Sequence, residues 1–172
     1  MRGFFKLTST PLFFIMSDMA KAGLQFSNKD DWGTPKEVVD FFGSFDYDPA
    51  TTPERAELFG IPHYDTIETD GLKTDWSQYK KIWCNPPFTR KFEFLKKAVE
   101  TKSKVFFLLP IESLTTKKFH DIIADDIPYT VWLPDGRIKF QSNDRESSSP
   151  AFGSVVLELK TPEYKVKHWR VN

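Results

Sequence analysis

Short apolar runs of strand length alternate along this chain with segments whose apolar residues recur every three or four positions. The strand-like runs cover residues 45–49, 80–85, 104–110, 129–134 and 152–159. The run at 104–110, KVFFLLP, is apolar at almost every position, which is the pattern of a parallel strand buried on both faces. A turn signal, PDG, precedes a further short strand that ends at Phe140.

Three segments have the spacing of amphipathic helices, and they cover residues 34–45, 90–100 and 115–124. In the first, Thr34 stands at the capping position and Pro35 at the first helical position. In the second, Phe92, Leu95 and Val99 fall on one helical face. Strands separated by helices predict an α/β fold with right-handed crossovers, and we expect a mostly parallel sheet with an antiparallel C-terminal edge.

The length of 172 residues suits a single compact domain. We expect this domain to span residues 28–172. Residues 1–27 are expected to be a poorly ordered extension or the result of a misassigned start codon, because Met16 and Met19 offer alternative starts. Polar residues and a proline at 8–11 interrupt the apolar patch near the N-terminus, and no run reaches the length of a membrane span. The expected location is therefore the cytoplasm.

Cysteine and histidine are scarce. Cys84 is the one cysteine, which excludes an internal disulfide and fits a reducing compartment. The histidines, His63, His120 and His168, are dispersed along the chain and lack the spacing of metal ligands. We expect no metal site.

The formal net charge is zero, yet the charges are unevenly distributed. Residues 28–76 carry 12 acidic and 4 basic side chains, whereas residues 80–104 carry 8 basic and 2 acidic ones. An acidic half and a basic stripe indicate two ligands, one that tolerates carboxylates and one that is polyanionic. The alternative, that these lysines only cover solvated helix faces, is equally compatible with the charges.

Ligands of an open α/β sheet bind beyond the carboxyl ends of its strands. Three segments follow such ends here: Asp48-Pro49-Ala50, Asn85-Pro86-Pro87-Phe88 and Leu109-Pro110. We expect them to converge on one crevice.

The Asn85-Pro86-Pro87-Phe88 corner has a distinct chemistry. Its prolines fix φ at about −65° and hold Asn85 and the nearby carbonyls rigid. An amide oxygen and a main-chain carbonyl held together can accept both protons of an exocyclic amine, while Phe88 stacks on the ring that carries it. Such acceptors would direct the nitrogen lone pair at the methyl group of a sulfonium cofactor. The alternative is a rigid strand-to-loop turn with a capping Asn85.

Seven blocks occur in the order DWGTP, DYDPA, DGLKTDW, IWCNPPF, VFFLLP, GRIKF and FGSVV, between about residues 31 and 160. In this order they resemble the small phage-type DNA N6-adenine methyltransferases, relatives of the Dam-like enzymes. The resemblance implies a Rossmann-like sheet, S-adenosylmethionine as cofactor, DNA as partner, and the host-cell cytoplasm for a phage-encoded chain. Two departures are the absence of a glycine-rich loop after residue 49 and a phenylalanine, Phe88, where tyrosine is commoner.

The resemblance also implies roles for single residues. Asn85, Pro86, Pro87 and Phe88 match the catalytic motif, with Asn85 and the Pro86 carbonyl as acceptors for adenine N6. The implied cofactor-binding positions are Trp32, Thr34 and Pro35 at the amino-acid end, Asp48, Pro49 and Ala50 at the first strand end, and Asp70 and Leu72 near the adenosine, with Asp75 competing with Asp70.

Four basic residues are candidates for DNA contact. Arg90 and Lys91 directly follow the motif, and Arg137 and Lys139 lie in the GRIKF block, where a hairpin turn with solvated bases is an equal alternative. We expect methyl transfer to adenine N6 in DNA with base flipping and with phosphate contacts from the basic stripe. The alternatives are a methyltransferase for an amine or amide of RNA or protein, and an inactive DNA-binding module.

Overall fold

The computed structural model describes residues 33–123, 127–142, 145–148 and 152–170, and it describes side chains outside 141–150. The expected extension at 1–27 and the predicted cofactor residue Trp32 lie outside the described residues. No helix within these ranges is long and apolar enough to cross a membrane.

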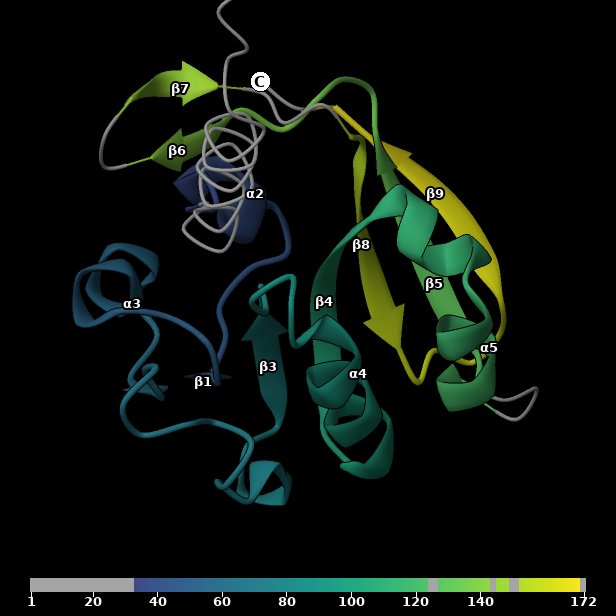
Figure 1. The fold of residues 1–172 in the computed structure, drawn as a ribbon, viewed down its shortest axis with the longest axis horizontal. Helices are drawn as coiled ribbons and strands as arrows, with labels where there is room; N and C mark the ends of the chain where they lie inside the picture. Colours follow the sequence, from purple (N-terminus) through teal and green to yellow (C-terminus); the bar gives the residue numbers. More distant parts are fainter. Residues whose placement is uncertain (1–32, 124–126, 143–144, 149–151, 171–172) are drawn as a thin grey trace, which may run out of the picture. The chain divides into compact units, whose positions relative to one another are not determined.

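A seven-stranded sheet has the order β2-β1-β3-β4-β8-β5-β9 (Figure 1). Its strands are β1 (Tyr47–Asp48), β2 (His63–Tyr64), β3 (Lys81–Cys84), β4 (Lys104–Pro110), β5 (Tyr129–Pro134), β8 (Ser154–Leu159) and β9 (Lys165–Trp169). Neighbours pair in parallel except around β8, which is antiparallel to both β4 and β5. The mostly parallel α/β fold is thus confirmed, and the antiparallel strand from the C-terminal part lies inside the sheet. A separate hairpin pairs β6 (Phe140–Ser142) with β7 (Arg145–Ser148).

Helices pack on both faces of the sheet. They are α2 (Lys36–Phe41), α3 (Pro53–Phe59), α4 (Lys91–Glu100) and α5 (Lys117–Ile123), with 3-10 turns η2 (Trp76–Gln78) and η3 (Ile111–Thr115). The helices α4 and α5 cover one face (Figure 1), and α2 packs in a second core on the other.

Strand β4 explains why the sheet needs helices on both faces. Val105, Phe107 and Leu109 enter the core under α4 and α5, while Phe106 and Leu108 enter the core under α2. All five are nearly inaccessible to solvent, as the continuous apolar run predicted.

Two helices differ from their sequence prediction. Helix α2 begins at Lys36 with Pro35 as its N-cap and no side-chain cap, so the predicted capping role of Thr34 is wrong. Helix α3 lies in a region without an apolar stripe, yet Thr52 caps it by accepting a hydrogen bond from the Arg55 N–H at 3.4 Å. Gly60 ends α3 in the left-handed conformation, with φ of 66°.

Candidate active site

The predicted strand ends lie together at the carboxyl end of the parallel strands. Strands β1, β3 and β4 are parallel, with Tyr47 opposite Ile82 and Cys84 opposite Phe107. Their carboxyl ends therefore point the same way, and the segments that begin at Asp48, Asn85 and Pro110 leave the sheet on this side.

Asn85 is held by a residue far away in the sequence. Its Nδ2 donates a hydrogen bond of 3.1 Å to Oγ1 of Thr34, whose residue is only 2% exposed. Because the NH₂ group is engaged on this side, the amide oxygen is turned toward the opposite side. The hydroxyl expected to cap α2 thus orients the amide of the motif.

The turn after Asn85 is tight and aromatic. The Arg90 N–H donates to the Pro87 carbonyl at 3.0 Å, and Nζ of Lys91 donates to the Phe88 carbonyl at 3.2 Å. The half-buried ring of Phe88 meets Phe152 in a T-shaped contact, with centroids 5.2 Å apart and planes at 87°. Phe152, which precedes β8, was not singled out in the sequence, although it belongs to the FGSVV block.

Asp48 is a buried carboxyl group at the end of β1, with 2% of the residue exposed. Its Oδ1 accepts a hydrogen bond of 3.0 Å from the Ala50 N–H, and its carbonyl accepts one of 2.9 Å from the Asp65 N–H. Burial raises the pKa of Asp48 to about 7, against the lowering effects of Ala50 N–H, Thr51 and the charge of Arg55. This carboxyl group therefore changes charge near neutral pH.

The Asp70-Gly71-Leu72 segment touches the end of β1. A Cβ on Gly71 would lie 2.1 Å from the Pro49 carbonyl oxygen, so only glycine lets the two backbones approach this closely. Asp70 has a φ of 58° and accepts from Nη1 of Arg90 at 3.2 Å, which links this segment to the motif. The Leu72 carbonyl accepts from Lys97 Nζ.

Asp75, the competing choice for Asp70, is committed elsewhere. Its Oδ1 accepts from the Ser77 N–H at 2.9 Å and caps η2. Asp70, with Gly71 packed against Pro49, is the residue that adjoins the predicted cofactor segment.

Arg55 in the first turn of α3 was not singled out in the sequence. Its Nη1 is buried, and no hydrogen-bond partner for it is found in the described part of the chain. Its guanidinium fills the space in which a Cβ of Gly33 would stand, only 1.5 Å from Nη2. The signal that could have drawn attention to it is the Thr52-Pro53 start and Gly60 end of α3.

The predicted DNA-contacting residues differ in their surroundings. Arg90 forms ion pairs with Asp70 and Glu93, at 3.2 and 3.3 Å. Arg137 and Lys139 are exposed, whereas Ile138 between them is buried in the second core.

The basic stripe at residues 80–104 is divided by the fold. Lys81 and Lys104 begin β3 and β4, so they lie at the amino ends of these strands, opposite the end that carries the motif. Lys81 donates to the Phe42 carbonyl, and Lys104 pairs with Glu158. These two lysines thus lie away from the motif, and phosphate contacts from the basic stripe stay a prediction.

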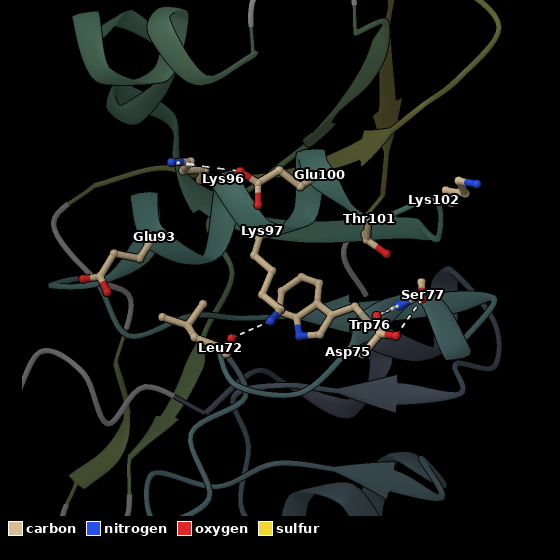
Figure 2. Close-up of a pocket in the computed structure, with 10 residues that line it drawn as sticks. All are labelled: Leu72, Asp75, Trp76, Ser77, Glu93, Lys96, Lys97, Glu100, Thr101 and Lys102. Atoms are coloured by element: carbon tan, nitrogen blue, oxygen red, sulfur yellow. Dashed lines mark hydrogen bonds and ion pairs between the residues drawn. The ribbon is translucent and has the colours of Figure 1, made fainter.

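A groove of about 670 Å³ runs along α4 rather than across the strand ends (Figure 2). It is lined by Leu72, Asp75, Trp76, Ser77, Glu93, Lys96, Lys97, Glu100, Thr101 and Lys102. Acidic and basic side chains alternate around it, and it contains none of the motif residues. Among the residues that the structure describes, no group of three His, Cys, Asp or Glu side chains could hold a metal ion.

Comparisons with known proteins agree with the sequence resemblance. A DNA N-6-adenine-methyltransferase of Escherichia phage T1 is 27% identical over 193 aligned positions, which cover 97% of this chain and 80% of the relative.

Two solved structures are remote likenesses. A Listeria monocytogenes protein assigned to the class I S-adenosylmethionine-dependent methyltransferases has a TM-score of 0.43 and 16% identity, covering 68% of this chain and 44% of that one. A mutant of MtNAS in complex with S-adenosylmethionine has a TM-score of 0.30 and 13% identity, covering 85% of this chain and 62% of that one.

The family comparison covers most of the chain. The model of the family described as "DNA N-6-adenine-methyltransferase (Dam)" matches residues 21–166, which include every site residue predicted from the sequence. This match confirms the family inferred from the ordered blocks and agrees with S-adenosylmethionine as the cofactor. The chain belongs to the DNA N-6-adenine-methyltransferase (Dam) family.

Proposed function

We propose that the protein transfers a methyl group from S-adenosylmethionine to N6 of adenine in DNA. The observation that carries this proposal is the 3.1 Å hydrogen bond from Asn85 to the buried Thr34, at the carboxyl end of β3 and beside the ring of Phe88. It gives the motif amide a defined orientation in the region where an α/β sheet binds its ligands.

In the proposed mechanism, the protein positions an amine and supplies no general base. The Asn85 amide oxygen and the Pro86 carbonyl accept the two N6 protons of adenine, and Phe88 stacks on the purine. Two acceptors favour a tetrahedral nitrogen, which localises its lone pair and directs it along the line of attack. S-adenosylmethionine would supply the electrophilic methyl group and leave as S-adenosylhomocysteine, and the proton that the methylated N6 loses would pass to solvent. Pro87 fixes the turn, so that Asn85 and Phe88 keep their relative geometry before the base arrives.

The residues at the strand ends fit this cofactor. The cofactor carries a sulfonium and an ammonium group, which suit the carboxyl groups of Asp48 and Asp70. The buried Nη1 of Arg55 has no hydrogen-bond partner among the described ranges, and the charge of this arginine acts on Asp48, which supports a polar site beside these carboxyl groups. We assign Thr34, Pro35, Asp48, Pro49, Ala50, Asp70 and Leu72 to this site, and Trp32 stays a prediction outside the described residues.

The proposed DNA contacts follow from the position of the base pocket. A base reaches a pocket at a strand end only after it leaves the helix stack, so we infer base flipping. Arg90 and Lys91 adjoin this pocket, and the exposed side chains of Arg137 and Lys139 offer further phosphate contacts.

Transfer of labelled methyl groups from S-adenosylmethionine into DNA, RNA and protein, in parallel, tests the proposal. We expect label in DNA at adenine N6, none with Asn85→Ala, little with Phe88→Ala, and partial activity with Phe88→Trp, which keeps a stacking face. Unchanged circular dichroism and urea midpoints would show that Asn85→Ala is folded. Label in RNA or protein alone, or wild-type transfer by Asn85→Ala, contradicts the proposal.

A further inference from the structure

One nitrogen of the Arg55 guanidinium, Nη1, is buried. It has no hydrogen-bond partner among the residues that the structure describes. A buried donor without a partner loses its hydration and gains nothing in return, and the cost is greater for a charged group. Native structures keep few such groups, and each requires an explanation.

The local structure holds the Arg55 guanidinium in place. The Arg55 N–H is tied to Oγ1 of Thr52, which fixes the first turn of α3. The guanidinium packs against the Cα of Gly33, where any Cβ would overlap Nη2, Cζ and Nη1 at 1.5 to 1.8 Å. Gly33 is followed directly by Thr34, which holds the motif amide of Asn85. The guanidinium therefore lies beside the segment that orients the motif amide.

The charge of Arg55 is not neutralised by a close partner among the described residues. Burial raises the pKa of Asp48 and the charge of Arg55 lowers it in part, yet the ion pairs within 4.0 Å among the described residues do not include Arg55. The Asp48 carboxyl group is instead engaged with the Ala50 N–H. An external anion would give the buried Nη1 its missing acceptor.

S-adenosylmethionine carries one anionic group, the α-carboxylate of its methionine part. A guanidinium matches a carboxylate through two parallel N–H···O bonds. A DNA phosphate is the other available anion, but it would approach from the surface, whereas Nη1 of Arg55 is buried.

We infer that Arg55 binds the α-carboxylate of S-adenosylmethionine, with its guanidinium held in the space that Gly33 leaves by having no Cβ. This inference rests on the proposed function only for the identity of the cofactor, and it does not depend on DNA as the substrate.

Binding measured by calorimetry without DNA tests the inference. The probes are S-adenosylmethionine and decarboxylated S-adenosylmethionine, which lacks the carboxylate, and the proteins are wild type, Arg55→Met and Arg55→Lys. Wild type is expected to bind the complete cofactor about tenfold or more tightly than the decarboxylated one. In Arg55→Met this ratio should fall to within about twofold, because only binding of the complete cofactor weakens, and Arg55→Lys should retain part of it.

The matched control is Arg170→Met, since the Arg170 side chain is 85% exposed and pairs with Asp135 at 3.3 Å. It should keep the wild-type ratio. Equal weakening of both ligands in Arg55→Met would indicate a merely structural role and overturn the inference, as would equal affinity of wild type for both ligands. Loss of DNA binding with unchanged cofactor binding would assign Arg55 to a phosphate instead. If wild type discriminates as expected but methylates no DNA, only the proposed substrate fails.

Discussion

The hydrogen bond between Thr34 and Asn85 makes a quantitative prediction about catalysis. Thr34→Val keeps the shape of a side chain that is 2% exposed, and it removes the acceptor that Asn85 Nδ2 uses at 3.1 Å. Asn85 then lacks the bond that orients its NH₂ group, so that this group faces the substrate amine in part of the molecules. Those molecules present a donor where the reaction needs an acceptor.

The expected loss follows from the strength of this bond. A buried neutral hydrogen bond stabilises one arrangement by about 0.5–1.5 kcal/mol, so its loss slows methyl transfer by at most roughly 2- to 13-fold, and by about twofold if the two amide orientations become equally populated. Thr34→Ser retains the hydroxyl and loses only a methyl group, so it should stay close to the wild-type rate.

The assay is the single-turnover rate of methyl transfer at saturating S-adenosylmethionine and DNA, with cofactor affinity measured separately by calorimetry. If Thr34 positions Asn85, the rate at saturating cofactor falls in Thr34→Val, whether or not its place in the cofactor site also raises the cofactor Kd. A normal rate with a raised cofactor Kd would refute this reasoning and leave Thr34 with the cofactor contact alone. Equal losses in Thr34→Val and Thr34→Ser would refute it as well.

Two further predictions concern the end of β1. Gly71→Ala places a Cβ 2.1 Å from the Pro49 carbonyl oxygen, and it should destabilise the fold by about 1–3 kcal/mol in urea unfolding. The control is Gly136→Ala, because a Cβ there would have nothing within 4 Å. Equal urea midpoints of the two variants would contradict the prediction. Because burial raises the pKa of Asp48 from 3.8 to about 7, the folded protein retains a proton that the unfolded chain has lost between these pH values. Stability should therefore fall with rising pH by about 1.4 kcal/mol per unit in this window, and Asp48→Asn should remove that slope; an unchanged slope in urea titrations at pH 5, 6 and 7 would contradict it.

The elements that the sequence predicted are those whose information is local. The apolar run of β4 and the Asn85 to Phe88 corner combine stiff backbone with an unambiguous pattern, and both lie where expected. The convergence of the strand ends could also be predicted, because neighbouring parallel strands have their carboxyl ends on the same side.

The features that were missed depend on contacts between distant segments. Thr34 has the residue type of a helix cap, and only the fold shows that its hydroxyl serves a side chain 51 positions away. Arg55 was not singled out because α3 has no apolar stripe, and only the fold shows that its guanidinium packs against Gly33. The division of the basic stripe has a similar origin, since α4 returns the chain from the carboxyl end of β3 to the amino end of β4.

The antiparallel strand β8 sets the order in which the chain can complete its sheet. Strands β4 and β5 both pair with β8, so neither has its inner neighbour until Ser154–Leu159 has been synthesised. Until then Phe106 and Phe107 belong to a strand with an open edge, which is the kind of surface that recruits other chains. Strands β1 and β3 are synthesised first, but the sheet to which they belong is completed only after the last quarter of the chain has been made. Translation speed and chaperone access over that final stretch thus bear on the yield of native protein.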